Sequence, residues 1–103
     1  MCIRDRRNMD FLIYAEDKAD SLHIRQAARN DHLTWLKAPS AVKLLTAGPW
    51  LDDEGVMRGS LLIVKANDKN TVLEWISHDP YKTAGLTASV TVKAYNWVIG
   101  RPA

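Results

Sequence analysis

Proton-exchanging side chains offer the most direct chemistry in this sequence. His32 falls in a segment with the pattern of a helix, and Asp79 directly follows a second such segment. An imidazole can hold or release a proton near neutral pH, and a carboxylate can fix its tautomer and stabilise its cation. The two residues can meet where both helices end over a sheet. Judged by spacing alone, however, an ordinary tether between two helices is the better-supported interpretation.

Basic and hydroxyl side chains accompany this histidine. Arg29 precedes His32 by three positions and Arg25 by seven, so the three side chains lie near one stripe of a continuous helix and can bind an acidic substrate. A solvated or ion-paired role is equally open for Arg29 and better supported for Arg25. Ser60 and Tyr81 carry hydroxyls that can orient a ligand, or they serve as a strand hydroxyl and a packed loop aromatic.

The histidine and cysteine content argues against a metal site. His23, His32 and His78 show no two-histidine helical spacing, and Cys2 is the only cysteine. The glycines are not spaced as a phosphate-cradling loop either. The sequence therefore predicts chemistry that uses no metal and no other cofactor.

Length and composition are those of one compact domain. The chain has 103 residues, of which 47% are hydrophobic, enough for a single modest core. Its 14 basic and 12 acidic residues nearly cancel, which makes nucleic acid an unsuitable partner. The longest apolar runs fall far short of the roughly 20 residues that cross a bilayer, so no membrane partner is expected. A single cysteine cannot form an intramolecular disulfide, which fits a cytoplasmic location.

The ends of the chain are expected to lie outside the folded unit. Residues 1–8 are polar and charged, without the apolar region of a secretory signal, and are interpreted as a non-native or disordered leader. Met9 is a plausible start of the natural protein. The expected organisation is a single domain over residues 9–100, followed by a tail over residues 101–103.

Hydrophobic periodicity and turn residues predict the elements that must position these side chains. The first helix begins at a possible cap, Asp20–Ser21, and Asn30–Asp31 is expected to break it in its middle because both side chains compete for backbone hydrogen bonds. Asp68 is the expected cap of the second helix, which Asp79–Pro80 ends. In chain order, we expect a strand at 11–15, a helix at 20–37, a hairpin of strands 41–47 and 60–66, a helix at 68–79 and a strand at 90–95.

This βαββαβ order predicts a ferredoxin-like α+β fold, with a four-stranded antiparallel sheet and both helices on one face. On the last strand Val90, Val92 and Ala94 are expected to face the core. The alternate residues Thr91, Tyr95 and Trp97 then lie on the open face of the sheet. Because that face is too aromatic to leave in water, a partner sheet is its expected cover, and the chain is predicted to form a homodimer.

An ordered set of short motifs resembles the YciI-like (YCII-related) family. The resemblance covers about Met9 to Gly100 and rests on 14–22 (YAEDKADSL), Arg25, Arg29, His32–Leu33, 47–49 (AGP), 51–55 (LDDEG), Gly59–Ser60, 79–81 (DPY), 84–86 (AGL) and 96–98 (NWV). It implies a dimeric α/β barrel related to muconolactone isomerases and similar small enzymes. It also implies a site built around a histidine–aspartate pair, matched here by His32 and Asp79. In one departure, Asn30–Asp31 stands where many relatives have proline after the residue matching Arg29.

With the resemblance included, the leading hypothesis is a cofactor-independent lyase or isomerase. Its substrate would be a small cyclic or hydroxylated acidic metabolite, because one branch of the family resembles dehydrochlorinases of hydroxylated aromatic compounds. His32 would act as general acid or base, Asp79 would orient it, and Arg29 would hold substrate charge. Ser60 and Tyr81 would orient the substrate. The alternatives are a non-catalytic dimeric protein that binds a small ligand, and an assembly role for the open sheet face.

Overall fold

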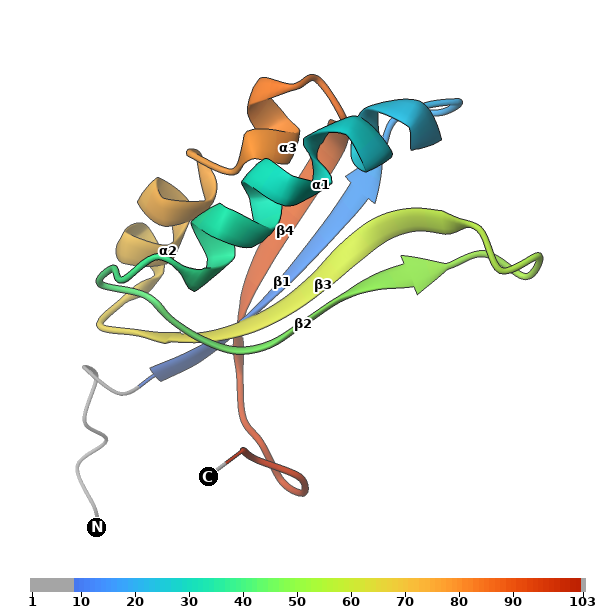
Figure 1. The fold of residues 1–103 in the computed structure, drawn as a ribbon. Helices are drawn as coiled ribbons and strands as arrows, with labels where there is room; N and C mark the ends of the chain where they lie inside the picture. The colour runs from blue at the N-terminus through green and yellow to red at the C-terminus, as the bar shows by residue number, and fades with distance from the viewer. Residues whose placement is uncertain (1–8, 103) are drawn as a thin grey trace, which may run out of the picture.

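The computed structural model describes residues 9–102, so the predicted leader over residues 1–8, with Cys2, lies outside the described part, as does Ala103. Figure 1 shows one sheet with its helices gathered on one side. The elements in chain order are β1 (Met9–Asp17), α1 (Leu22–Lys37), β2 (Lys43–Leu51), β3 (Met57–Ala66), α2 (Lys69–Ile76), α3 (Pro80–Thr83) and β4 (Thr87–Tyr95).

The sheet has the order β2-β3-β1-β4, and every neighbouring pair is antiparallel. β1 and β3 occupy the centre, where Phe11 pairs with Val64 and Ile13 with Leu62. The predicted ferredoxin-like α+β fold with a four-stranded antiparallel sheet is therefore confirmed. The short helix α3 is an addition, since the sequence predicted a single helix before the last strand.

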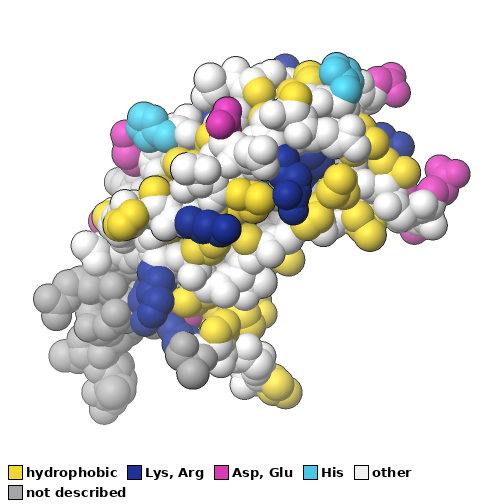
Figure 2. All heavy atoms as spheres, in the orientation of Figure 1, with side chains coloured by type: hydrophobic (Ala, Val, Ile, Leu, Met, Phe, Trp, Pro, Cys, Tyr) yellow, Lys and Arg dark blue, Asp and Glu magenta, His cyan; other side chains and the backbone are white. Residues whose placement is uncertain are grey.

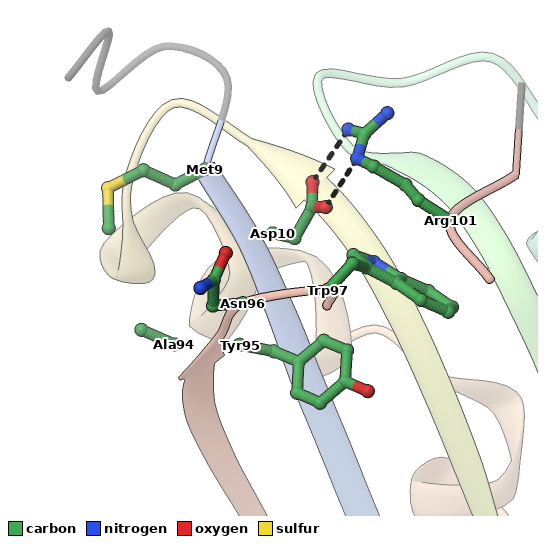
Figure 3. A pocket seen from close by; sticks show the side chains of 7 residues that line it. All are labelled: Met9, Asp10, Ala94, Tyr95, Asn96, Trp97 and Arg101. Atoms are coloured by element: carbon green, nitrogen blue, oxygen red, sulfur yellow. Dashed lines mark hydrogen bonds and ion pairs between the residues drawn. The ribbon is translucent and has the colours of Figure 1, made fainter. Parts of the chain in front are cut away.

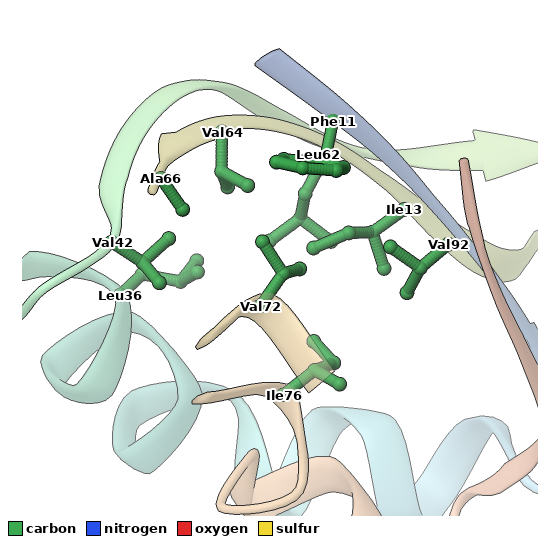
Figure 4. Close-up of a cluster of buried hydrophobic side chains, with 10 residues drawn as sticks. All are labelled: Phe11, Ile13, Leu36, Val42, Leu62, Val64, Ala66, Val72, Ile76 and Val92. Atoms are coloured by element: carbon green, nitrogen blue, oxygen red, sulfur yellow. The ribbon is translucent and has the colours of Figure 1, made fainter. Parts of the chain in front are cut away.

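The core lies between the sheet and the helices. Alternate residues of β1 and β3 point toward α1 and α2, as the period of two in a strand requires. Figure 4 shows these side chains converging. The buried cluster consists of Phe11, Ile13, Leu36, Val42, Leu62, Val64, Ala66, Val72, Ile76 and Val92. Burying each of the larger side chains contributes roughly 1.5–3 kcal/mol, so this cluster fixes the helices over the sheet.

The first helix is continuous, and the break expected at Asn30–Asp31 does not occur. Both side chains are exposed to water and neither interrupts the helical ladder. Continuity matters for the site, because Arg25, Arg29 and His32 then share one helical stripe. Asp68 caps α2 as predicted, accepting a hydrogen bond from the Thr71 amide at 2.8 Å.

The second strand is longer than the sequence indicated. β2 was expected to end at Gly48–Pro49, yet it pairs with β3 as far as Leu51. Proline is tolerated there because β2 is an edge strand, and only one of its two sides must supply hydrogen bonds. This extension carries Gly48 and Pro49 alongside α1.

The last strand is less buried than predicted. Of its three expected core residues only Val92 is buried, whereas Val90 is 39% exposed and Ala94 is also exposed. β4 is an edge strand, and the helical layer covers only its middle. On the other face Tyr95 is 38% exposed, and Trp97, beyond the strand's end, meets its ring edge to face. Within residues 9–102, no helix has the length and apolarity needed to span a bilayer.

Candidate active site

A cavity of about 240 Å³ lies between α1, the β2–β3 hairpin and α3. Figure 2 shows basic side chains next to apolar ones in this region, between α1 and the hairpin. The polar side of the cavity is formed by Arg25, Arg29, His32, Ser60 and Tyr81. The opposite lining is mainly apolar and includes Leu33, Leu36, Pro49, Met57 and Leu62. Such a cavity suits a small molecule with one polar or charged edge.

His32 joins this cavity to a buried carboxylate. Its Nδ1 lies 2.8 Å from Oδ1 of Asp79, and both side chains are buried. Because an ionised carboxylate can only accept hydrogen bonds, Nδ1 must carry the proton in this contact. His32 lines the cavity and Asp79 does not. The carboxylate therefore lies behind the imidazole, and Nε2 is left to exchange a proton.

The position of Asp79 is fixed by the backbone that follows it. It is the N-cap of α3, and its Oδ1 also accepts a hydrogen bond from the Tyr81 amide at 2.9 Å. Pro80 occupies the first helical position, where its missing N–H costs nothing and its fixed φ suits a helix. The Asp-Pro-Tyr motif thus starts α3, beyond the end of α2 at Ile76, and sets the carboxylate that holds His32.

Arg25 is buried in an ion pair that spans three elements. Its Nε and Nη2 donate to the two carboxylate oxygens of Asp17, at 2.7 and 2.9 Å, and Nη2 also donates to Ser60 Oγ at 2.8 Å. Burial opposes the charged form of Arg25, but the hydrogen bond and charge of Asp17 outweigh it and raise the pKa of the guanidinium. The bidentate contact neutralises Arg25, which is a permanent cation.

Tyr81 contacts both the arginine and the histidine. Its ring stacks on the imidazole of His32, with centroids 3.8 Å apart, and the guanidinium carbon of Arg25 lies 4.7 Å from the ring centroid. Burial raises the pKa of the Tyr81 phenol, with a further rise from the charge of Asp79 and an opposing effect from Arg25. Tyr81 therefore stays protonated and supports His32 from the side.

Ser60 and Arg29 complete the polar lining. Ser60 Oγ accepts from Arg25, and within residues 9–102 it donates to no acceptor, so its hydrogen is available to a bound molecule. Arg29 is exposed and, in the same residues, takes part in no ion pair. Judged by the contacts among residues 9–102, Arg29 is therefore the cation of the cavity whose charge no carboxylate neutralises.

The hairpin wall is held by a tryptophan on its far side. Trp50 Nε1 donates to the Ala15 carbonyl at 2.9 Å, and the indole lies against Gly59, where any Cβ would collide with it. Its ring also stacks on Tyr14, with centroids 5.4 Å apart. Trp50 follows Pro49 directly, so these contacts fix the strand that carries the cavity wall.

The structure brings all five predicted site residues into one place, with His32, Arg29, Ser60 and Tyr81 on the cavity surface and Asp79 behind His32. Sequence reasoning missed Asp17 and undervalued Arg25. The available signal was the stripe shared by Arg25 and His32, because an arginine that faces inward needs a carboxylate partner. In the described part of the chain, no group of three or more His, Cys, Asp or Glu residues is arranged to hold a metal ion.

Comparison with known proteins identifies close relatives. The family model of the YCII-related domain matches residues 9–96. An uncharacterised protein of Haemophilus influenzae and protein YciI of Escherichia coli O6:H1 are each 37% identical over 97 residues, which cover 87% of this chain and 99% of theirs.

Solved structures agree with this family resemblance. The 5-chloro-2-hydroxyhydroquinone dehydrochlorinase of Burkholderia phenoliruptrix AC1100, solved with 2,5-dihydroxybenzoquinone, superposes with a TM-score of 0.76 at 34% identity, over 85% of this chain and 94% of its own. A transcriptional regulator of Neisseria meningitidis, solved with L-methionine, gives a TM-score of 0.57 at 12% identity, over 98% and 60%. At that identity the regulator shares the fold alone, which therefore does not decide function.

Proposed function

This chain belongs to the YCII-related domain family, as its motifs predicted, and we propose that it is a cofactor-independent lyase or isomerase with His32 as its acid–base residue. The observation that carries the proposal is a buried carboxylate behind a histidine that lines a cavity. This arrangement leaves one imidazole nitrogen to act on a bound molecule, as general acid–base catalysis requires.

His32 Nε2 takes a proton from the substrate, and Asp79 stabilises the imidazolium that results. In the elimination of a hydrogen halide, the proton comes from a carbon of the substrate, and the electrons of the broken C–H bond form a new double bond. The halide leaves with the electron pair of its bond to carbon, and the proton stays on His32 until solvent removes it. In an isomerisation, the same proton returns at another carbon. The stacked ring of Tyr81 and the fixed N-cap Asp79 hold the imidazole in one orientation for either reaction.

The charges of the cavity favour a substrate with a single negative group. Arg25 is neutralised by Asp17, so Arg29 is the cation that binds a carboxylate or an ionised hydroxyl. Ser60 donates its hydroxyl hydrogen to a substrate oxygen on the same side. The apolar wall opposite receives the ring.

The cavity volume favours a single ring over a fused one. About 240 Å³ is below the range of about 300–1,000 Å³ typical of sites for drug-sized ligands. The dehydrochlorinase relative acts on a hydroxylated, chlorinated single ring, and its structure holds a dihydroxylated quinone. We therefore place the substrate among small hydroxylated cyclic acids and phenols.

We further propose that the protein acts as a homodimer in the cytoplasm. The open sheet face carries Tyr14 and Tyr95, which are 39% and 38% exposed, and a second sheet of the same kind is the natural cover for such a face. A chain with one cysteine suits a reducing compartment.

Turnover tests the proposal directly. Purified protein is incubated with 5-chloro-2-hydroxyhydroquinone and with a panel of hydroxylated cyclic acids, while chloride release and product formation are followed. His32→Gln should lower kcat by about 100- to 10,000-fold on whichever compound reacts. His78→Gln is the matched control, because His78 also contacts a carboxylate but lies on the surface.

Binding separates the enzyme from its rival, a small-ligand carrier. Titration with 2,5-dihydroxybenzoquinone measures affinity, and Arg29→Leu should weaken it. If a compound binds tightly but is returned unchanged, and His32→Gln alters affinity alone, the proposed enzyme function is refuted. The protein is then a binding protein for a small ligand.

A further inference from the structure

The chain beyond β4 forms a short arm, residues 96–101, that holds two aliphatic side chains in water. Val98 and Ile99 are each 87% exposed, the highest values among the large hydrophobic residues described. Gly100 has φ +86°, a left-handed conformation that turns the chain back. Arg101 then donates from Nε and Nη2 to the carboxylate of Asp10, at 3.1 and 3.3 Å. A turn closed by this ion pair therefore holds Val98 and Ile99, which form the tip of the arm, in contact with water.

A hollow of about 350 Å³ lies beside this arm, where β1 begins and β4 ends. Figure 3 shows Tyr95 and Trp97 along it, close to the Asp10–Arg101 pair. The indole Nε1 of Trp97 is buried and has no hydrogen-bond partner within the described residues. Buried indole N–H groups normally find an acceptor, so this donor indicates a group that residues 9–102 of a single copy do not supply.

We propose that the arm interlocks two copies of this chain, with Val98 and Ile99 of each copy seated in the hollow of the other. A two-fold axis makes such an exchange reciprocal, because the same tip and the same hollow exist on both copies. The hollow has room for two aliphatic side chains, and carbonyl groups of the incoming tip supply the acceptor for Trp97 Nε1.

A second copy accounts for more of the structure than another apolar partner does. An unrelated protein would need one surface for the tip and a second for the hollow, whereas a second copy of this chain carries both. The hollow is also continuous with Tyr95, on the sheet face proposed to pair. The inference rests on the proposed homodimer and is independent of the proposed chemistry.

Substitution at the tip tests the interlock first. Val98→Asp/Ile99→Asp should weaken dimerisation at least tenfold in sedimentation velocity over a concentration series. Leu73→Asp is the matched control, since Leu73 is an aliphatic residue of α2 that is 43% exposed. Urea unfolding checks that both variants remain folded. A double variant that dimerises as tightly as the control overturns the proposal.

Disulfide trapping gives an answer that does not depend on stability. In a Cys2→Ser background, Ile99→Cys and Asn96→Cys chains of different tag length are mixed and oxidised. We expect a mixed covalent dimer, because Asn96 lines the hollow that receives Ile99. Ile99→Cys mixed with Leu73→Cys should give none.

The outcomes separate this proposal from the homodimer itself. A wild-type protein that stays dimeric, with no mixed disulfide and no effect at the tip, refutes the interlock and leaves the dimer standing. A monomeric wild type refutes both. Turnover is measured in parallel, so a failure of the proposed reaction is recorded separately.

Discussion

Two of the arginine–aspartate pairs within residues 9–102 are nearly equal in length but lie in opposite surroundings. Arg25 and Asp17 meet at 2.7 Å with side chains 5% and 8% exposed, whereas Arg58 and Asp52 meet at 2.8 Å with side chains 42% and 27% exposed. The inner pair ties β1 to α1 and, through Ser60, to β3. The outer pair spans the turn of one hairpin, where its hydrogen bond lowers the pKa of Asp52 and raises that of Arg58.

Two histidine–carboxylate pairs repeat the contrast. His32 and Asp79 lie 2.8 Å apart, are 8% and 11% exposed, and come from distant parts of the chain. His78 and Glu74 lie 3.2 Å apart, are 69% and 78% exposed, and occupy neighbouring turns of the chain. Because His78 directly precedes Asp79, residue type and sequence neighbourhood do not separate the candidate site from the surface. Burial, a fixed carboxylate and access to a cavity do.

The largest expected effect comes from replacing one arginine of each pair. Arg25→Met keeps an unbranched apolar stem but removes the guanidinium and leaves Asp17 buried without its partner, and breaking a buried pair in this way costs about 3–5 kcal/mol. Arg58→Met should cost far less, because water takes over its contacts. Urea unfolding at one fixed protein concentration measures both. Equal losses of unfolding free energy would mean that the buried pair stabilises the fold no more than the exposed pair does.

The second comparison removes one carboxylate of each histidine pair. Asp79→Ala deletes the N-cap of α3 and leaves the buried His32 N–H unsatisfied, for a combined loss of about 2–4 kcal/mol in the free energy of unfolding. Glu74→Ala should change it by about 0.5 kcal/mol or less. A small loss at Asp79 would show that water satisfies His32 and that the carboxylate is not needed to hold it.

This contrast also explains how far the sequence could predict the molecule. The order of elements followed from local patterns, as did the cap at Asp68, because these depend on neighbouring residues. The end expected for the second helix at Asp79–Pro80 was wrong, since α2 ends at Ile76 and Asp79–Pro80 begins α3. The burial of Arg25 and its pairing with Asp17 could not be predicted from local patterns, since both depend on how β1 and α1 pack in space. The same applies to β2, where Pro49 continues a strand only because nothing pairs with its outer side.

The smallest and most specific effect is expected at Tyr81, which lies between the two buried pairs. Tyr81 contacts both Arg25 and His32, and burial raises the pKa of its phenol above the ordinary value of about 10. As pH rises past that value, the unfolded chain loses this proton first, so it binds fewer protons than the folded chain and stability falls. The fall continues until the folded phenol also ionises. Unfolding free energies measured across this range should decline less steeply for Tyr81→Phe than for the wild type. Parallel profiles of unfolding free energy against pH would mean that the phenol is as well solvated as in the unfolded chain. The pairs Arg25–Asp17 and His32–Asp79 would then not share one environment that excludes water.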